Sequence, residues 1–472
     1  MSSLVETLTA SGGTESVGFL NDIVRQLWPN ICVAGARMIK EIAEPIFATT
    51  LPSPLNTLQF KKIDLGTVPL HFSKVDVHRT ENEGIKLDLD IDWDGKSDIE
   101  LDGSMLPKMG IEHFKLKGRL SILLCPLTNT LPLIGAAQVA FINPPSLELD
   151  FTDAAHIANL SVIDKAIRKV ILSIIASYAV LPNRFLVKID PSNDFFRTYQ
   201  HPEGVLRLSV VSGTNLGRSK EGKSFLKKLV HDEPDCYAKV AVSAEAEWQT
   251  ATAKNSRNPT WNETRDFVIS DYDQSIGVDV NDDDTANTDD DIGLATTTVK
   301  KLLLSGGRQE LPLTHKGVAT DGSVVIAGEM FKFVPRPDSF GEEGPGIHGM
   351  MTVLVASAFG IQGRREQLKP SVKVDWGTHG NFRTAIKQDA PGSDVQNPSW
   401  DQAFRIPILA HMIPGPPVRI TLMDGEQERG SVHVPLDEVL AAQNMQLEKF
   451  FEVGDGATVR AGIWLRGTAP AE

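Results

Sequence analysis

Residues 278–293, VDVNDDDTANTDDDIG, place seven carboxylates in a short stretch between two apolar runs. An acidic run of this kind is usually a solvated or disordered segment. Here, however, Asp282, Asp284 and Asp290 follow the spacing D-x-D-x5-D. Carboxylates crowded on one loop repel each other unless a cation lies among them, and Ca²⁺ suits a loop because it accepts oxygen ligands at flexible angles. The stretch therefore predicts a calcium-binding loop, which Asp235 from a second loop would complete.

Short apolar runs separated by turn residues surround the acidic loop. Their lengths and intervals are typical of antiparallel strands in a β-sandwich. The pattern predicts an all-β domain over residues 200–334, in which the acidic loop joins two strands. The runs are VLRLSVV, CYAKVAV, WQTATA, DFVIS, SIGVDV and VVIAGEMFKF.

The same layout returns after a linker. Residues 335–348 are rich in proline and glycine, as connecting segments often are. Beyond them a second set of runs repeats the first in the same order, and such a repeat indicates a duplicated domain. We therefore expect a second all-β domain at residues 349–469. The repeated pairs are MTVLVAS with VLRLSVV, Asn397-Pro-Ser-Trp400 with Asn258-Pro-Thr-Trp261, and VRAGIWLRG with VVIAGEMFKF.

The second copy has lost most of the acidic loop. Only Asp424 and Glu426 remain in a shortened stretch, and Pro370 stands where the counterpart of Asp235 is expected. Because fewer carboxylates supply fewer oxygen ligands, this domain is predicted not to bind calcium.

Residues 16–190 combine helical and strand patterns and predict an α+β domain. Ser16 can cap a first helix, which Pro29 is expected to interrupt before a second helical segment. Residues 85–93 alternate strictly between apolar and charged side chains, the mark of a half-buried strand. A capped apolar helix is predicted after residue 158. Further strands are expected at 68–77, 99–101, 111–124, 138–141 and 147–151.

The apolar face of these strands has two interpretations. It packs a solid core, which is the commoner arrangement, or it lines a cavity. Periodicity alone does not distinguish them.

Four segments of this region resemble, in order, the SMP (synaptotagmin-like, mitochondrial, lipid-binding) domain of extended synaptotagmins, tricalbins and plant synaptotagmins. They are SVGFLNDIVRQLWPNI, EIAEPIFATTLPSPLNTLQFKKIDLGTVPL, FKLKGRLSILLCPL and SIIASYAVLPNRF. The resemblance implies a tubular, TULIP-like fold, a lengthwise groove for the acyl chains of glycerophospholipids, and a homodimer or heterodimer joined head to head. The residues expected to face the groove are Ile85, Leu87, Leu89, Ile91, Trp93, Ile122, Leu124, Ile171 and Ile175.

The two β domains resemble C2 sandwiches, whose apical loops meet membranes. In the first, the acidic loop matches the third calcium loop of that family and Asp235 matches its first-loop aspartate, which implies Ca²⁺ as the bound ion. Glu221 stands where a further first-loop aspartate is expected, with two extra residues beside it. Whether Glu221 is a fifth ligand stays open.

The first loop of this domain also contains a nucleotide-binding pattern. Residues 217–224 satisfy G-x-x-x-x-G-K-[ST], but a true P-loop needs a long helix and a parallel sheet, whereas Pro234 cuts the helix short and antiparallel strands follow. The lysines of this loop suit an anionic membrane, because basic residues mixed with apolar ones bind such membranes. The alternative is that the loop is an ordinary solvated one. The expected membrane-contact residues are Lys220, Lys223, Lys227, Lys228 and Phe225.

Composition restricts the partners and the compartment. The formal charge of −14 argues against nucleic acid. Three cysteines without motif spacing favour a reducing, cytosolic compartment. The chain shows neither a signal peptide nor a membrane-spanning apolar run, and residues 1–15 are expected to be disordered. Relatives carry an N-terminal membrane anchor, so we expect that this sequence is part of a longer protein or that another protein anchors it.

The favoured function is lipid transfer and tethering by a peripheral protein at contact sites between the endoplasmic reticulum and the plasma membrane, gated by calcium. The alternative is a calcium-dependent phospholipid-binding scaffold that moves no lipid. An enzyme is not expected, because the sequence has no G-x-S-x-G, H-x-x-x-H or C-x-x-C motif.

Overall fold

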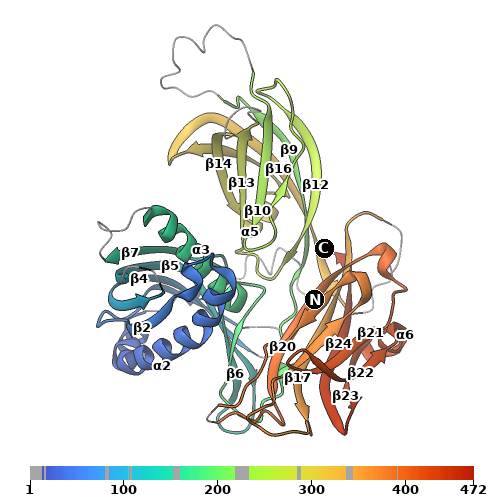
Figure 1. Ribbon diagram of the computed structural model, residues 1–472. Coiled ribbons are helices and arrows are strands. Elements are labelled where there is room, and N and C mark those ends of the chain that lie inside the picture. The colour runs from blue at the N-terminus through green and yellow to red at the C-terminus, as the bar shows by residue number, and fades with distance from the viewer. Residues whose placement is uncertain are drawn as a thin grey trace.

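The computed structural model describes residues 13–14, 17–79, 84–104, 106, 109–152, 160–217, 233–283, 289–335, 344–390 and 392–471. Figure 1 shows three parts: an N-terminal domain (residues 13–198) on the left, a first sandwich (204–334) at the top and a second sandwich (347–470) at the lower right. Several predicted site residues, among them Glu221, Asp284 and the lysine-rich first loop, lie outside the described residues.

A single long helix, α2 (Gly18–Thr50), opens the N-terminal domain, so the predicted interruption at Pro29 is wrong. A proline inside a helix costs about 3 kcal/mol, and buried contacts on both sides outweigh that cost. Before the proline, Trp28 is buried and its Nε1–H donates to the Gly66 carbonyl at 3.0 Å. After it, Ala43 and Phe47 are buried in the core.

A strongly curled eight-stranded sheet follows, in which β2 pairs with β4 and β7 with β5 beside the main path β1-β3-β4-β5-β6-β8. Gly13 and Thr14 form β1 and pair with Val77 and Asp76, so the sheet begins inside the segment expected to be disordered. The remaining elements are η1 (Leu55–Thr57), β2 (Gln59–Asp64), β3 (His71–Arg79), β4 (Ile85–Asp102), β5 (Met109–Leu127), β6 (Ile134–Phe141), β7 (Ser146–Thr152), α3 (Leu160–Ala179), β8 (Phe185–Lys188) and α4 (Phe195–Thr198).

The first sandwich has the antiparallel strands that its alternating runs predict. Its core joins side chains from both layers, including Leu208, Trp261 and Val278. The elements are β9 (Gly204–Thr214), β10 (Cys236–Val242), β11 (Trp248–Gln249), β12 (Thr260–Ile269), β13 (Ser275–Asp282), β14 (Asp290–Thr298), α5 (Val299–Leu304), β15 (Arg308–His315) and β16 (Val318–Val334).

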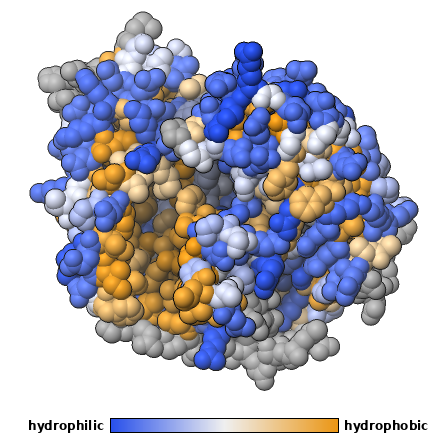
Figure 2. Space-filling model, turned by 90° about the horizontal axis from the view of Figure 1, so that it is seen from below, coloured by the Kyte–Doolittle hydropathy of each residue, from blue (hydrophilic) through white to orange (hydrophobic). Residues whose placement is uncertain are grey.

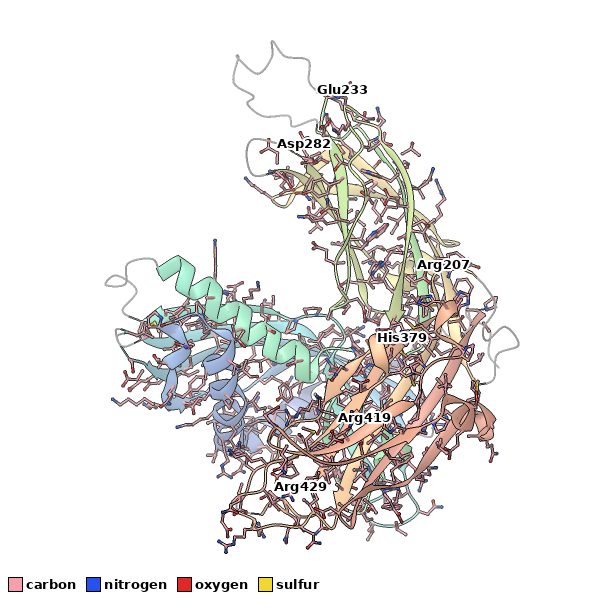
Figure 3. The ribbon with its side chains drawn as sticks, turned by 45° about the vertical axis from the view of Figure 1, so that its right-hand side comes forward. Arg207, Glu233, Asp282, His379, Arg419 and Arg429 are labelled. Atoms are coloured by element: carbon pink, nitrogen blue, oxygen red, sulfur yellow. The ribbon has the colours of Figure 1, made fainter. Side chains whose placement is uncertain are left out.

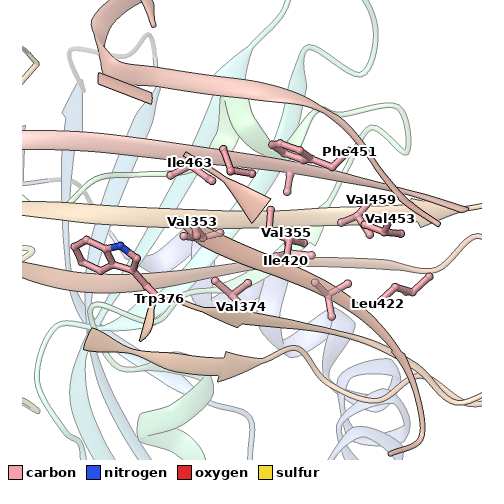
Figure 4. Close-up of a cluster of buried hydrophobic side chains, with 14 of the residues drawn as sticks. Val353, Val355, Val374, Trp376, Ile420, Leu422, Phe451, Val453, Val459 and Ile463 are labelled. Carbon is pink, nitrogen blue, oxygen red and sulfur yellow. The ribbon is translucent and has the colours of Figure 1, made fainter. Parts of the chain in front are cut away.

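The second sandwich repeats this architecture. Trp376 is fully buried in its core beside Val353 and Val374 (Figure 4), and its Nε1–H donates to the Pro416 carbonyl at 2.8 Å. The elements are β17 (Ile347–Phe359), β18 (Pro370–Asp375), η4 (Gly377–His379), β19 (Asn381–Arg383), β20 (Ser399–Leu409), η5 (Ala410–Met412), β21 (Val418–Asp424), β22 (Gln427–Val434), α6 (Leu436–Ala441), η6 (Gln443–Met445), β23 (Gln446–Gly454) and β24 (Ala457–Pro470).

The two sandwiches share a continuous sheet, because β16 pairs with β24 from Phe331↔Pro470 to Val334↔Gly467. The N-terminal domain is fixed to both of them. Phe195 and Phe196 of α4 pack against Trp464 of β24.

The contact with the first sandwich is polar. The β6–β7 turn inserts Asn143, whose Oδ1 accepts the backbone N–H of Ser275 at 2.7 Å, while the Ile142 carbonyl accepts from Ser243 Oγ at 2.9 Å. Beside the turn, Lys86 Nζ lies 2.5 Å from Asp271 Oδ2. The N-terminal domain is thereby joined to the first strand residue of β13 and to the residue after β10.

Candidate functional site

Three strand ends bring the predicted acidic residues together. Asp235 precedes β10, Asp282 ends β13 and Asp290 begins β14. The strand register places Cys236 opposite Asp282, and Asp282 opposite Asp290. All three aspartates therefore lie at one end of the first sandwich, where Figure 3 labels Asp282.

Backbone hydrogen bonds hold these carboxylates in place. The Asp235 N–H donates to Asp282 Oδ1 at 2.7 Å, and the Asn255 N–H donates to Asp235 Oδ1 at 2.7 Å. The Asp283 N–H donates to the Asp235 carbonyl at 2.9 Å, which ties the two loops to each other. Asp235 thus lies directly beside Asp282 and Asp283 at the strand ends.

The electrostatic potential at this end is negative. Burial, together with the charges of Asp282 and Asp235, raises the pKa of the Cys236 thiol to about 12. Burial, together with a 2.5 Å hydrogen bond that Tyr237 donates to Asp289 Oδ2, raises the pKa of Tyr237 to about 12. Burial is the larger cause of both shifts, and the neighbouring carboxylates add to it because they crowd negative charge at this end of the sandwich.

Carboxylate oxygens are the donors that a hard divalent cation such as Ca²⁺ prefers, so Asp235, Asp282 and Asp290 fit this ion chemically. Within the described ranges, however, no three His, Cys, Asp or Glu side chains lie close enough together to hold a metal. Asp284 and Glu221 lie outside those ranges. A complete calcium site needs a contribution from them.

The equivalent end of the second sandwich carries cationic side chains instead. The Lys369 N–H donates to Asp424 Oδ1 at 2.8 Å, as Asp235 does to Asp282, and Pro370 lies opposite Asp424 in the strand register. Lys369, not Pro370, therefore occupies the position of the first-loop aspartate.

A guanidinium group neutralises Asp424, one of the two acids that remain in this loop. Arg429 Nη2 lies 2.6 Å from Asp424 Oδ2, and its Nη1 lies 3.8 Å from Asp455 Oδ2. The side chain of Arg429, labelled in Figure 3, thus bridges two loops with its own positive charge. That this sandwich does not bind calcium stays a prediction.

The apolar face of the N-terminal sheet forms a cross-strand ladder. Ile85 pairs with Leu124 and Leu87 with Ile122, while Trp93 lies opposite Leu116. Figure 2, which views the molecule from below, shows a hollow with hydrophobic walls on the left, in this domain. Several side chains of the ladder are only half-buried, so this face is not completely covered within the described residues.

The nine residues expected to face the groove divide into two groups. Leu89 and Ile91 are only 1% and 5% exposed, because they pack with Phe72, Val75 and Phe141 in the core beneath. The other residues of the set are half-buried: Ile85, Leu87, Trp93, Ile122, Leu124, Ile171 and Ile175.

The opposite face of the sheet carries the charged side chains that the alternation of residues 85–93 predicts. They form a network in which Arg119 lies 2.7 Å from Asp76 and 2.8 Å from Asp90, and the partners Asp76 and Arg119 were not expected from the sequence. Helix α2 also exposes apolar residues four positions apart, among them Phe19 and Ile23, at 63% and 48%. That spacing was visible in the sequence, but which face of the helix is covered was not.

Comparison with protein families agrees with these three parts. Residues 13–190 match the model of the synaptotagmin-like mitochondrial-lipid-binding domain, and residues 204–313 and 349–453 match the C2 domain model. Extended synaptotagmin-3 of Xenopus tropicalis is 25% identical over 480 residues, which cover 96% of this chain and 53% of that protein. Human extended synaptotagmin-2 is 24% identical over 483 residues, covering 96% of this chain and 50% of that protein.

A solved structure of extended synaptotagmin 2, comprising its SMP domain and two C2 domains, has the same fold, with a TM-score of 0.66 and 23% identity. It covers 97% of this chain and 100% of its own. This chain spans about half the length of the curated relatives named above. The helices of the described residues include none that is long and apolar enough to cross a membrane.

Proposed function

We propose that this chain, an SMP-domain protein with two C2 domains, carries glycerophospholipid in the groove of its N-terminal domain and docks on anionic membranes through its first sandwich. The observation that carries the proposal is the apolar ladder of β4 and β5, several of whose side chains are only half-buried, in a domain with a hydrophobic-walled hollow on its surface (Figure 2). Exposed apolar surface of this extent is costly in water, and acyl chains would remove it from solvent.

The second part of the proposal is calcium-dependent docking. Asp235, Asp282, Asp284 and Asp290, with Glu221 as the candidate fifth ligand, would hold Ca²⁺ between the loops. The bound ion would cancel the negative potential there and leave coordination positions for lipid phosphate oxygens. Lys220, Lys223, Lys227, Lys228 and Phe225 of the first loop are proposed to contact the same membrane.

We place this activity at contact sites between the endoplasmic reticulum and the plasma membrane, as the resemblance implies, with the lipid carried and not chemically changed. A calcium-dependent scaffold without lipid transfer is the alternative. Both functions use the same calcium-dependent docking site, but only the lipid-transfer protein carries lipid in the groove. The lipid content of the purified protein therefore decides between the two functions.

The first prediction is that the full chain co-purifies with one or two glycerophospholipids per N-terminal domain, with little headgroup preference, because the groove offers mostly apolar contacts. Mass spectrometry of the chloroform-extracted protein, against a parallel extract of a chain without an apolar groove, measures this. A protein free of lipid after gentle purification would favour the scaffold.

The second prediction concerns dimers. Helix α2 exposes Phe19, Ile23 and Leu27 at 63%, 48% and 48%, and an apolar stripe of this kind is often covered by a partner. We expect the full chain to sediment as a dimer at micromolar concentration and Ile23→Asp with Leu27→Asp to shift it toward monomer. Glu41→Ala on the same helix is the control. A monomeric wild type would refute dimerisation.

A further inference from the structure

The β5–β6 connection, residues 127–134, presents apolar side chains to solvent. Leu131 is 86% exposed, Leu133 is 50% exposed and Leu127 is 36% exposed. The other residues of the connection are Thr128, Asn129, Thr130, Pro132 and Ile134, so the whole segment carries no charge. A leucine this exposed forgoes the favourable free energy of burying its apolar side chain.

The segment is held in one conformation. The Thr128 N–H donates to the Leu133 carbonyl at 2.8 Å, and the Leu133 N–H donates to the Thr130 carbonyl at 2.7 Å. Thr128 Oγ1 donates to the Thr130 carbonyl at 2.8 Å. Leu133 has a φ of 71°, a region that disfavours any residue with a Cβ. These hydrogen bonds hold the backbone of the turn while the leucine side chains face solvent. The positive φ of Leu133 is a strained conformation that glycine would adopt more easily.

The hairpin that carries the tip also carries part of the groove face. Leu124 of the groove ladder pairs with Ala137, and Val187 of β8 pairs with Ala137 from the other side and is 45% exposed. The same two strands reach Leu127↔Ile134 three residues further on, about 10 Å along the strand, where these two side chains point to the opposite face of the sheet. The exposed tip thus follows directly on the groove strands, although its apolar side chains are not confined to the groove face.

The tip lies at the opposite end of the molecule from the calcium loops. Strand β6 begins beside the tip and leads to Asn143, which contacts Ser275 at the start of β13. Strand β13 then ends at Asp282. Figure 1 shows β6 below β13, and Figure 3 labels Asp282 at the top and Arg429 of the second sandwich at the bottom.

We propose that residues 127–134 insert into the interfacial layer of a lipid bilayer, independently of calcium, on the side of the molecule away from Asp282. A bilayer fits better than a protein partner because the tip is small, uncharged and apolar, and because it joins the two strands that carry Leu124 and Ala137 of the groove face. Positive charges near the hairpin are paired: Lys188 of β8 lies 2.7 Å from Asp401, and Arg460 lies 2.7 Å from Asp194. We therefore expect insertion into zwitterionic lipid.

Insertion of the tip into a bilayer does not depend on the proposed function. Only the further step, in which lipid passes between that bilayer and the groove, rests on it. Two membranes could then be held at the two ends of the chain, one by calcium at Asp282 and the other by leucines.

The test places an environment-sensitive fluorophore at the tip of the full chain. Leu131→Cys with Cys32→Ser leaves Cys125 and Cys236 buried, so a nitrobenzoxadiazole label reacts at residue 131. With phosphatidylcholine vesicles and a calcium chelator, emission should rise about threefold and brominated lipid should quench it. The matched control is a label at Val318→Cys, an apolar residue that is 69% exposed on the first sandwich, and its emission should stay unchanged.

A second variant tests the leucines directly. Leu131→Asn with Leu133→Asn should lower co-sedimentation with the same vesicles about tenfold, because two apolar anchors are lost, and asparagine tolerates the left-handed backbone at residue 133. Wild-type binding should not weaken at high salt, since apolar insertion is not screened.

Three outcomes would overturn the proposal. The first is an unchanged emission of the label at residue 131 with vesicles, and the second is vesicle binding that high salt abolishes and the double variant retains. The third is an emission change that depends on protein concentration without vesicles, which would identify a second copy of the chain as the occupant. None of these outcomes depends on the lipid content of the purified protein, so failure here is distinct from failure of the proposed function.

Discussion

Replacing Asp282 and Asp284 by asparagine should abolish calcium-dependent binding of the full chain to phosphatidylserine vesicles. Both substitutions keep the shape of the side chain and remove a ligand charge, so calcium affinity should fall on the order of a hundredfold while the fold survives. Without the ion, the remaining carboxylates still repel an anionic bilayer. Co-sedimentation with and without calcium measures the effect, and added salt should weaken the wild-type response because headgroup attraction is screened beyond about 8 Å.

The matched control is Asp291→Asn. Asp291 belongs to the same acidic run, is exposed, and lies 3.3 Å from His315 on the neighbouring strand, outside the proposed ligand set. This variant removes one charge from the same surface but should keep the calcium response. Glu221→Gln tests the fifth ligand, because it should lower calcium affinity several-fold if Glu221 coordinates and change nothing if it does not. Equal sedimentation of the wild type and the double variant in calcium would refute the site.

The sequence placed Asp282 and Asp290 at the two ends of one loop because that feature is local, whereas their binding of calcium stays a prediction. The D-x-D-x5-D spacing places aspartates at both ends of one loop, and the register Asp282↔Asp290 shows that the two strand ends lie side by side. The counterpart in the second sandwich was misassigned by one position. The loop before β18 differs in sequence from the loop before β10, so only the hydrogen bond from Lys369 to Asp424 reveals the true equivalence.

Which residues of the apolar face are covered could not be predicted from periodicity, for a reason that Leu87 and Leu89 illustrate. Both point to the same face of β4, yet Leu89 is 1% exposed and Leu87 is half-buried. The difference comes from what covers each of them, which depends on helices and strands far away in the sequence. The same holds for the contact between Asn143 and Ser275, which are separated by 132 positions.

In the long helix α2 a local signal led to a wrong prediction. Proline disfavours helix interiors, so Pro29 predicted an interruption that the structure does not have. The buried side chains of Trp28 and Phe47, on either side of it, belong to a core that local reasoning does not see. Tertiary packing therefore decided the conformation of this segment.

Filling the groove should remove the bound lipid without unfolding the domain. Leu87 and Ile122 face each other across β4 and β5, so Leu87→Trp with Ile122→Trp places two indole rings in the path of the acyl chains. We expect the lipid recovered per chain to fall to about a tenth or less, since acyl chains cannot share that volume. Mass spectrometry of extracted lipid measures it.

Thermal unfolding of the same variants decides whether the apolar face is a groove or a packed core. Overpacking a closed core costs about 1–3 kcal/mol per site, whereas a ring added to an open hollow costs little. The double variant should therefore keep its melting temperature. Leu89→Trp, at a buried position on the same face of the same strand, should lower it, and Lys96→Trp, at an exposed position of β4, should change neither stability nor lipid content. If Leu87→Trp with Ile122→Trp destabilises the domain as much as Leu89→Trp does, the face is a core and the groove does not exist.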